Sequence, residues 1–365
     1  MRQSFSAYLL TLLLVAMPAW AQPDVAQVKP SSNLLPKGRQ VRQLRQRSFQ
    51  KTVPPGNYSG ITWLGGDRYA VVSDKSETDG FFIFRLDIDS VKGHIRRVEN
   101  LGFRSSGKPN RDAEGIAWIA GRQTLMMVGE ADSRIVEYDL DGRPTGWVVQ
   151  LPPVGNATTR RAATAQGYES LSYDPNTRRL WTMSEAPSRP AHEGGGGVTA
   201  QKPGNPSSSM GGRERAVSLL SISLDDTAHI ATPYQYLLDA PRKSPARRRP
   251  YVNGVSEVLA LGDGSLLVLE REVWMASSGT RATAWCKLYR VFPDGQPADV
   301  PLAKQPVASW KTGLPSVPPR IANYEGMTLG PRLADGSQTV ILIADSQNRY
   351  KGLLRDWFKV ILLRP

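Results

Sequence analysis

The stretch Ala113-Glu114-Gly115-Ile116-Ala117-Trp118 begins with a small, an acidic and a glycine residue and continues with alternating apolar and small side chains. Alternation with a period of two residues is typical of a β-strand. Related stretches occur at residues 58–63, 168–173, 256–261 and 324–329. The glutamate recurs as Glu169, Glu257 and Glu325, and Ser59 replaces it in the first stretch. Such recurrence predicts a repeat architecture built from β-strands.

A second strand follows each of these stretches, after a turn rich in Gly, Asp and Asn. Each second strand is apolar and closes on an acidic residue; these residues are Asp74, Glu130, Glu185, Glu270 and Asp345. In an antiparallel hairpin the end of the second strand lies beside the start of the first. The two acidic series are therefore expected at one edge of the fold.

A third strand and a weaker fourth strand complete most of the repeats. Four-stranded antiparallel units repeated along 365 residues predict an all-β protein, specifically a β-propeller. We count five blades, and two long insertions leave room for a sixth. The last unit runs out of chain after its third strand, so residues 41–50 are expected to supply its outer strand and close the ring.

The first 21 residues have the pattern of a secretory signal peptide. Arg2 precedes an apolar run at residues 8–17, and Ala19-Trp20-Ala21 forms a cleavage site. We expect a periplasmic or secreted protein, a flexible leader at residues 22–40 and one propeller domain at residues 41–365. Its loop insertions are predicted at residues 186–215 and 239–253. No later apolar stretch reaches the length of a membrane span.

Composition restricts the partners and the sources of stability. Cys286 is the only cysteine, so a disulfide within the chain is excluded and stability must come from the core or from bound ions. The formal net charge is +13, and one basic run begins at Arg242 and ends at Arg249. We interpret this run as a solvated loop, with weak contact to anionic surfaces as the alternative. No nucleic-acid-binding module is recognisable.

The acidic residues predict a metal site if the first strand of each blade lines the propeller axis. Crowded, desolvated carboxylates repel one another, and a bound cation relieves the repulsion. The expected ligands are Glu114, Glu169, Glu257, Glu325, Asp74 and Asp345. Oxygen ligands suit Ca²⁺, whereas Zn²⁺ would favour His or Cys, and the three histidines lie outside these stretches. Alternatively, each glutamate accepts backbone hydrogen bonds within its own blade.

Polar and cationic residues beside the acids predict a site for an anionic substrate. Candidate catalytic residues are Glu114, Glu169, Arg111 and Arg271, and candidate substrate-binding residues are Lys75, Arg271, Asn348 and Arg349. Carboxylates, a cation and arginines together suit a small anionic ester. A serine nucleophile is disfavoured because no G-x-S-x-G motif is present.

Several motifs resemble those of the phytase-like family, whose members are described as having esterase-like activity of phytase. They include Arg111-Asp112-Ala113-Glu114-Gly115, Gly167-Tyr168-Glu169-Ser170-Leu171 and Asn323-Tyr324-Glu325-Gly326-Met327. The resemblance covers residues 57–365 and implies an exported propeller that hydrolyses phosphoesters or carboxylesters. Ser59 and the Gly-rich insertion depart from the family pattern. The alternative is a non-catalytic binding or scaffold propeller with a structural calcium ion.

Overall fold

The structure is a computed structural model that describes residues 41–154, 167–187, 215–224, 229–244, 250–316 and 319–365. Within these ranges the chain is almost entirely β-strand, with one short 3₁₀ helix, η2 (Tyr350–Gly352), and no α-helix. None of the described segments forms a helix with the length and apolarity needed to cross a membrane.

The strands form five antiparallel sheets, each corresponding to one predicted blade. Blade one contains β3 (Tyr58–Gly65), β4 (Arg68–Ser73), β5 (Thr78–Ile88) and β6 (Ile95–Pro109). Blade two contains β7 (Ala113–Ile119), β8 (Thr124–Gly129), β9 (Arg134–Tyr138) and β10 (Pro144–Gln150). Blade three contains β11 (Ser172–Asp174), β12 (Arg179–Met183) and β13 (Ala216–Ser223), with β14 (His229–Ile230) and β15 (Tyr234–Leu237) both paired to β13.

The remaining blades carry the longest hairpins and the closure of the ring. Blade four contains β16 (Tyr251–Ala260), β17 (Leu266–Met275), β18 (Ala282–Val291) and β19 (Gln305–Leu314). Blade five contains β20 (Asn323–Arg332), β21 (Gln338–Asp345), β22 (Trp357–Leu363), β1 (Val41–Gln43) and β2 (Arg47–Ser48). Strand β1 pairs antiparallel with β22, Val41 opposite Leu363, and β2 extends the same edge.

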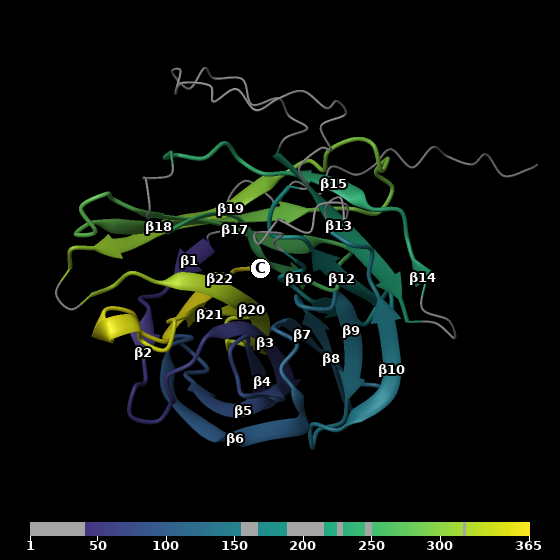
Figure 1. The fold of residues 1–365 in the computed structure, drawn as a ribbon, viewed down its shortest axis with the longest axis horizontal. Helices are drawn as coiled ribbons and strands as arrows, with labels where there is room; N and C mark the ends of the chain where they lie inside the picture. The colour runs from purple at the N-terminus through teal and green to yellow at the C-terminus, as the bar shows by residue number, and fades with distance from the viewer. Residues whose placement is uncertain (1–40, 155–166, 188–214, 225–228, 245–249, 317–318) are drawn as a thin grey trace, which may run out of the picture. The chain divides into compact units, whose positions relative to one another are not determined.

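The first strand of each blade faces the centre of the ring (Figure 1). Strands β3, β7, β11, β16 and β20 contact one another in this order, and β20 returns to contact β3. The fold is therefore a five-bladed β-propeller closed by an N-terminal strand, which confirms the predicted fold class.

The core is divided among the contacts between neighbouring blades. One apolar cluster joins blades five and one through Tyr58, Phe84, Ile343 and Phe358, all of which are buried. Strand β18 alternates buried and half-buried positions, as expected for a strand inside a propeller blade. Its Cys286 is a buried packing residue between blades four and five.

Several predicted segments lie outside the described residues. These are the signal peptide at residues 1–21, the leader at residues 22–40, most of the insertion at residues 186–215, and residues 245–249 of the basic run. They remain predictions. The described start of the basic run is anchored, because the backbone N–H groups of Arg242 and Lys243 donate to Glu272.

The glycine after the acidic residue is required by contact between blades. A Cβ atom on Gly115 would lie 2.4 Å from the backbone nitrogen of Leu171 in the next blade. Gly326 has the same relation to blade one, because its Cβ would lie 2.9 Å from the nitrogen of Ile61. The glycine of the repeated motif thus allows neighbouring inner strands to approach closely.

We expect Gly115→Ala to destabilise the protein by about 1–3 kcal/mol, the usual cost of forcing extra volume into a packed contact. Gly121→Ala is the matched control, because a Cβ at Gly121 meets no atom within 4 Å. Denaturant unfolding of both variants checks this expectation. Equal stability of the two variants would contradict the close inner-strand contact.

Candidate metal and substrate site

A β-bulge positions the acidic residue of the inner strand. In blade two, Ala113 pairs with Gly129 and Gly115 with Val128, so Glu114 is the extra residue. A bulge bends the strand and re-aims the side chain of its extra residue. Bulges lie at the same place in three other blades, with Ser59, Ser256 and Glu325 as the extra residues. In blade three Glu169 takes this place, next to the bridge between Tyr168 and Ser184.

The alignment predicted for the fourth stretch is wrong by one residue. Val255 pairs with Glu270 and Glu257 with Leu269, so Ser256 rather than Glu257 occupies the bulge. The Glu257 carboxylate instead accepts backbone N–H groups of Val258 at 3.0 Å and Met327 at 3.3 Å. Burial raises the pKa of Glu257 well above its ordinary value. Glu257 therefore connects backbone segments and does not join the other acids.

The same shift affects the second strand of blade four. In each blade, one residue of the second strand pairs with the residue just before the bulge. The residue that follows this partner is Asp74, Glu130, Glu185 or Asp345 in the other blades, but Arg271 in blade four. Glu270 contacts a different set of groups, accepting from the hydroxyl of Tyr236 at 2.8 Å and from Lys304 at 2.7 Å. An arginine thus takes the place of an acid at this edge of the propeller.

We call the carboxylates at this edge the acidic rim; its members are Asp74, Asp112, Glu114, Glu130, Glu169, Glu185, Glu325 and Asp345. Within the described residues, the cations in ion pairs with them are Lys75 and Arg271. The carboxylates of the rim therefore far outnumber its cations.

Glu114 lies at the centre of the half of the rim that has few counter-charges. Its carboxylate belongs to two groups whose oxygens lie within 4.8 Å of one another, one with Asp74 and Asp112, the other with Glu130 and Glu169. Only 5% of Glu114 is exposed, and its carboxylate has no hydrogen bond or ion pair with any described residue. A buried carboxylate without a partner is costly, so this half suits a bound cation.

Arg271 neutralises the other half of the rim. Its guanidinium pairs with Glu185 at 2.8 Å, with Glu325, and more distantly with Glu169 at 3.8 Å. Asn323 connects the group, because its side-chain oxygen accepts from Arg271 at 2.9 Å and its amide donates to Glu325 at 2.7 Å. Only 5% of the arginine is exposed, so the charge is fixed inside the protein.

The proton affinities of the rim reflect this crowding. Burial, followed by repulsion from neighbouring carboxylates, raises the pKa of Glu114 and Glu169 well above the ordinary value. Burial raises the pKa of Glu325 to about 8 and that of Asp74 to about 6, against the opposing effects of Arg271 and Lys75. In the absence of a cation, part of the rim therefore retains protons at neutral pH.

Lys75 and Asp112 stand at the exposed side of the site. Lys75 is 55% exposed, and its Nζ lies 2.6 Å from Asp112 and 3.1 Å from Asp74. Asp112 has a left-handed backbone with φ of 59°, and its N–H donates to the side chain of Asn110. The amide of Asn110 in turn donates to the carbonyls of Asp74 and Ser76. Sequence reasoning missed Asp112, although it directly precedes the repeated stretch.

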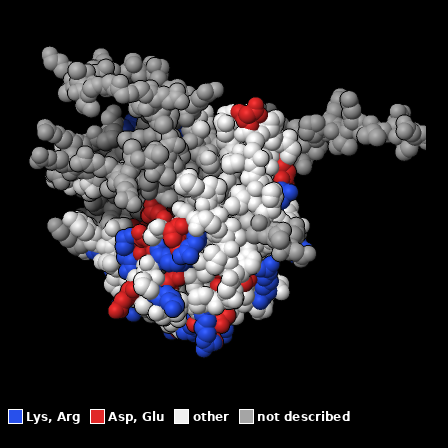
Figure 2. All heavy atoms as spheres, turned by 45° about the vertical axis from the view of Figure 1, so that its right-hand side comes forward, with Lys and Arg blue, Asp and Glu red and all other residues white. Residues whose placement is uncertain are grey.

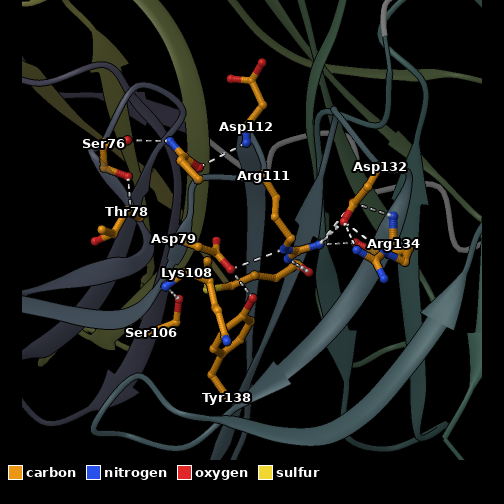
Figure 3. A network of polar contacts seen from close by, with 12 residues as sticks. Ser76, Thr78, Asp79, Ser106, Lys108, Arg111, Asp112, Asp132, Arg134 and Tyr138 are labelled. Atoms are coloured by element: carbon orange, nitrogen blue, oxygen red, sulfur yellow. Dashed lines mark hydrogen bonds and ion pairs between the residues drawn. The ribbon is translucent and has the colours of Figure 1, made fainter.

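The structure places Arg111 away from the rim carboxylates. Its guanidinium pairs with Asp79 at 3.2 Å and with Asp132 at 3.1 Å, while the hydroxyl of Tyr138 also donates to Asp79. Figure 3 shows Arg111 extending toward these partners and the side chain of Asp112 pointing the opposite way. Arg111 thus links blades one and two.

The two other predicted substrate-binding residues follow β21. Arg349 donates to Asp356 at 2.7 Å and to the carbonyl of Val53 at 2.6 Å. Asn348 is exposed in a left-handed turn with φ of 51°. Of the predicted substrate-binding residues, Lys75 and Arg271 are therefore the ones that contact the rim carboxylates.

The described surface in Figure 2 carries interspersed acidic and basic side chains. The view shows no single-sign patch among the described residues, despite the net charge of +13.

Several solved structures are similar to this chain at low sequence identity. Similar solved structures include virginiamycin B lyase from Staphylococcus aureus, with 11% identity, coverage of 89% of this chain and 100% of that chain, and a TM-score of 0.37. A member of the duf4221 family from Bacteroides vulgatus has 9% identity, coverage of 89% and 98%, and a TM-score of 0.39. Scores at this level carry no argument about activity.

The search of curated proteins finds no match. The family model "Phytase-like: Esterase-like activity of phytase" matches residues 53–347, which include blades one to four and strands β20 and β21 of blade five. The match confirms the resemblance of the sequence motifs and suggests a hydrolase-type propeller. This chain belongs to the phytase-like family, described as having esterase-like activity of phytase.

Proposed function

We propose that this protein is an exported, calcium-dependent hydrolase of small anionic esters, foremost phosphoesters. The observation that carries the proposal is the buried, unpartnered carboxylate of Glu114 at the junction of two carboxylate groups. Family membership supports hydrolysis as the class of reaction. The signal-peptide pattern of residues 1–21 supports a periplasmic or secreted location.

The donor atoms fit a hard cation. Both groups around Glu114 consist of carboxylate oxygens, and neither includes His or Cys. Ca²⁺ takes six to eight oxygen ligands in an adaptable geometry. The ligands on this half of the rim would be Asp74, Asp112, Glu114, Glu130 and Glu169. When bound, such a cation polarises an ester and lowers the pKa of an attacking water.

Lys75 and Arg271 have different proposed roles at the rim. The exposed ammonium of Lys75 is placed to pair with the anionic group of a substrate that approaches the rim. Arg271 holds Glu185 and Glu325 and leaves the opposite half open to a cation. Because burial raises the pKa of Glu114 and Glu169, protons compete with Ca²⁺ for these carboxylates, and the Ca²⁺ affinity should rise with pH.

A second candidate is a non-catalytic propeller in which Ca²⁺ is structural. The ion pairs of Arg111 and Arg349 favour it, because both guanidinium groups are already engaged with buried aspartates. A substrate anion would then meet few cations. The two candidates share the metal site and differ in turnover.

An esterase assay separates these candidates. Purified protein is incubated with a generic phosphoester and with a short-chain carboxylester, in Ca²⁺ and in excess chelator. We expect turnover of the phosphoester in Ca²⁺ and a loss of at least about 100-fold in chelator, the scale of one lost electrostatic catalyst. Absence of turnover for both esters, together with a lower melting temperature in chelator, would support the structural ion instead.

A further inference from the structure

A second charged site lies between the outer parts of blades four and five. A pocket of about 430 Å³ is formed by the end of β19, by Ser316 and Arg320, by the start of β22 and by the linker between β1 and β2. Its lining residues are Arg45, Gln46, Lys311, Thr312, Gly313, Ser316, Arg320 and Trp357. None of these residues belongs to the acidic rim.

The charged groups of this pocket all have the same sign. Among the described residues, Arg45, Lys311 and Arg320 line the pocket and no carboxylate does. None of the three cations has an ion pair with a residue in the described ranges. Arg355 adds a fourth cation nearby, with its guanidinium 5.8 Å from the ring of Trp357 and its buried Nε without a partner. The closest acids in sequence, Glu325 and Asp356, are already paired with other arginines.

The walls of the pocket are fixed by hydrogen bonds between separate segments. The side chain of Gln46 donates to the carbonyl of Arg320 at 2.9 Å, and the indole of Trp357 donates to the carbonyl of Ile321 at 3.1 Å. Ser316 accepts from the N–H of Arg320 at 2.9 Å and donates to the carbonyl of Gly313 at 3.1 Å. The three cations are therefore carried on backbone segments that are held together before a ligand arrives.

We propose that this pocket binds a phosphate group, either as the free ion or as part of a small phosphorylated molecule. Guanidinium and ammonium groups that line one pocket without carboxylate partners match the charge of a phosphate oxyanion. The volume is within the range of small-molecule sites, and Trp357 gives the pocket one apolar wall. Binding here does not require the metal or the activity of the acidic rim.

Calorimetric titration of the full-length protein tests the proposal, with excess chelator present so that no metal at the rim can bind phosphate. One arm uses inorganic phosphate and the other a hexose monophosphate. We expect saturable binding in at least one arm, and Lys311→Ala/Arg320→Ala should weaken it at least about tenfold, since hydrogen bonds between charged groups are lost. Tighter binding of the hexose monophosphate would show that the pocket recognises the phosphorylated molecule. Equal binding of the two ligands would show that it recognises the phosphate group alone.

The matched control is Lys51→Ala/Lys92→Ala. It removes two exposed lysines, one between β2 and β3 and one between β5 and β6. It should leave the affinity within about twofold, because neither lysine lines the pocket. Arg45→Ala, on a separate segment, should also weaken binding and covers the case in which the double variant fails to fold. No binding of either ligand up to about 10 mM, or equal weakening by the control pair, would overturn the proposal.

Discussion

Replacing Glu114 with glutamine is expected to weaken Ca²⁺ binding at least about 100-fold and to reduce Ca²⁺-dependent turnover by a similar factor. Glu114 is the residue shared by both carboxylate groups on the open half of the rim. Its replacement therefore removes a negatively charged ligand from both groups and leaves only a neutral amide oxygen in its place. Isothermal titration calorimetry and the phosphoester assay measure the two effects.

The same substitution should stabilise the metal-free protein at about pH 8. Burial raises the pKa of Glu114, Glu169 and Glu325 above the values of an unfolded chain, so the folded state binds more protons. The contribution of these three carboxyl groups to metal-free stability is then greatest at acid pH and is lost as the pH rises toward about 8, the folded pKa of Glu325. Glutamine at position 114 removes a buried carboxyl group whose ionisation burial disfavours, so the melting temperature should rise without Ca²⁺.

Glu137→Gln is the matched control for Glu114→Gln. Glu137 is also buried, but it lies in β9 and accepts from Thr124 and Thr145, away from the rim. Its substitution should lower stability and leave Ca²⁺ affinity unchanged. Equal Ca²⁺ affinity of the two variants would show that Glu114 is not a ligand.

Arg271→Gln is expected to cost about 3–5 kcal/mol in the metal-free protein, the usual effect of removing one partner from a buried ion pair. The melting temperature should fall by on the order of 10 °C. Glu185 and Glu325 lose their cation, and Glu169 loses a more distant one. Because these carboxylates then resemble the open half of the rim, the variant should bind one more equivalent of Ca²⁺ and recover stability in its presence.

Arg85→Gln provides the comparison for Arg271→Gln. Arg85 pairs with Asp67 and Glu99 but is 43% exposed, so its replacement should cost less than about 1 kcal/mol. Thermal unfolding with and without Ca²⁺ distinguishes the two variants. If Arg271→Gln melts like Arg85→Gln, or if Ca²⁺ does not restore it, Arg271 does not act as an internal counter-ion.

The repeated pattern was sufficient to predict the propeller. Alternation within each stretch, the paired acidic series and the missing outer strand of the last unit led to five blades and to closure by residues 41–50. These features depend on local periodicity and on hairpin geometry, both of which are visible in a sequence. Strands β1 and β2 pair with β22 as this reasoning requires.

The candidate site could be predicted only in outline, because side-chain direction depends on pairing register. In blade four, Ser256 and Glu257 both fit the repeated pattern, and only the pairing of Val255 with Glu270 shows which residue is in the bulge. A shift by one residue reverses the direction of a side chain. The sequence therefore gave no sign that Arg271 aligns with the acids of the other blades.

Long-range partners were equally invisible in the sequence. Arg111 lies next to Asp112, yet its guanidinium pairs with Asp79 and Asp132 from other parts of the chain. Asp112 and Glu130 were not predicted as ligands, although both fall in the groups around Glu114. Their contribution follows from contacts between blades, which a repeat unit examined alone does not contain.

Titration of the metal-free, unsubstituted protein with Ca²⁺, in two buffers of different protonation enthalpy, tests the metal site most directly. We predict binding with a dissociation constant at or below about 1 mM, the upper range of extracellular calcium modules. We also predict release of protons, because the raised pKa values of Glu114 and Glu169 favour their protonated forms in the metal-free state. Absence of binding at about 10 mM Ca²⁺, or binding without proton release that Glu114→Gln leaves unchanged, would contradict a cation site on the acidic rim.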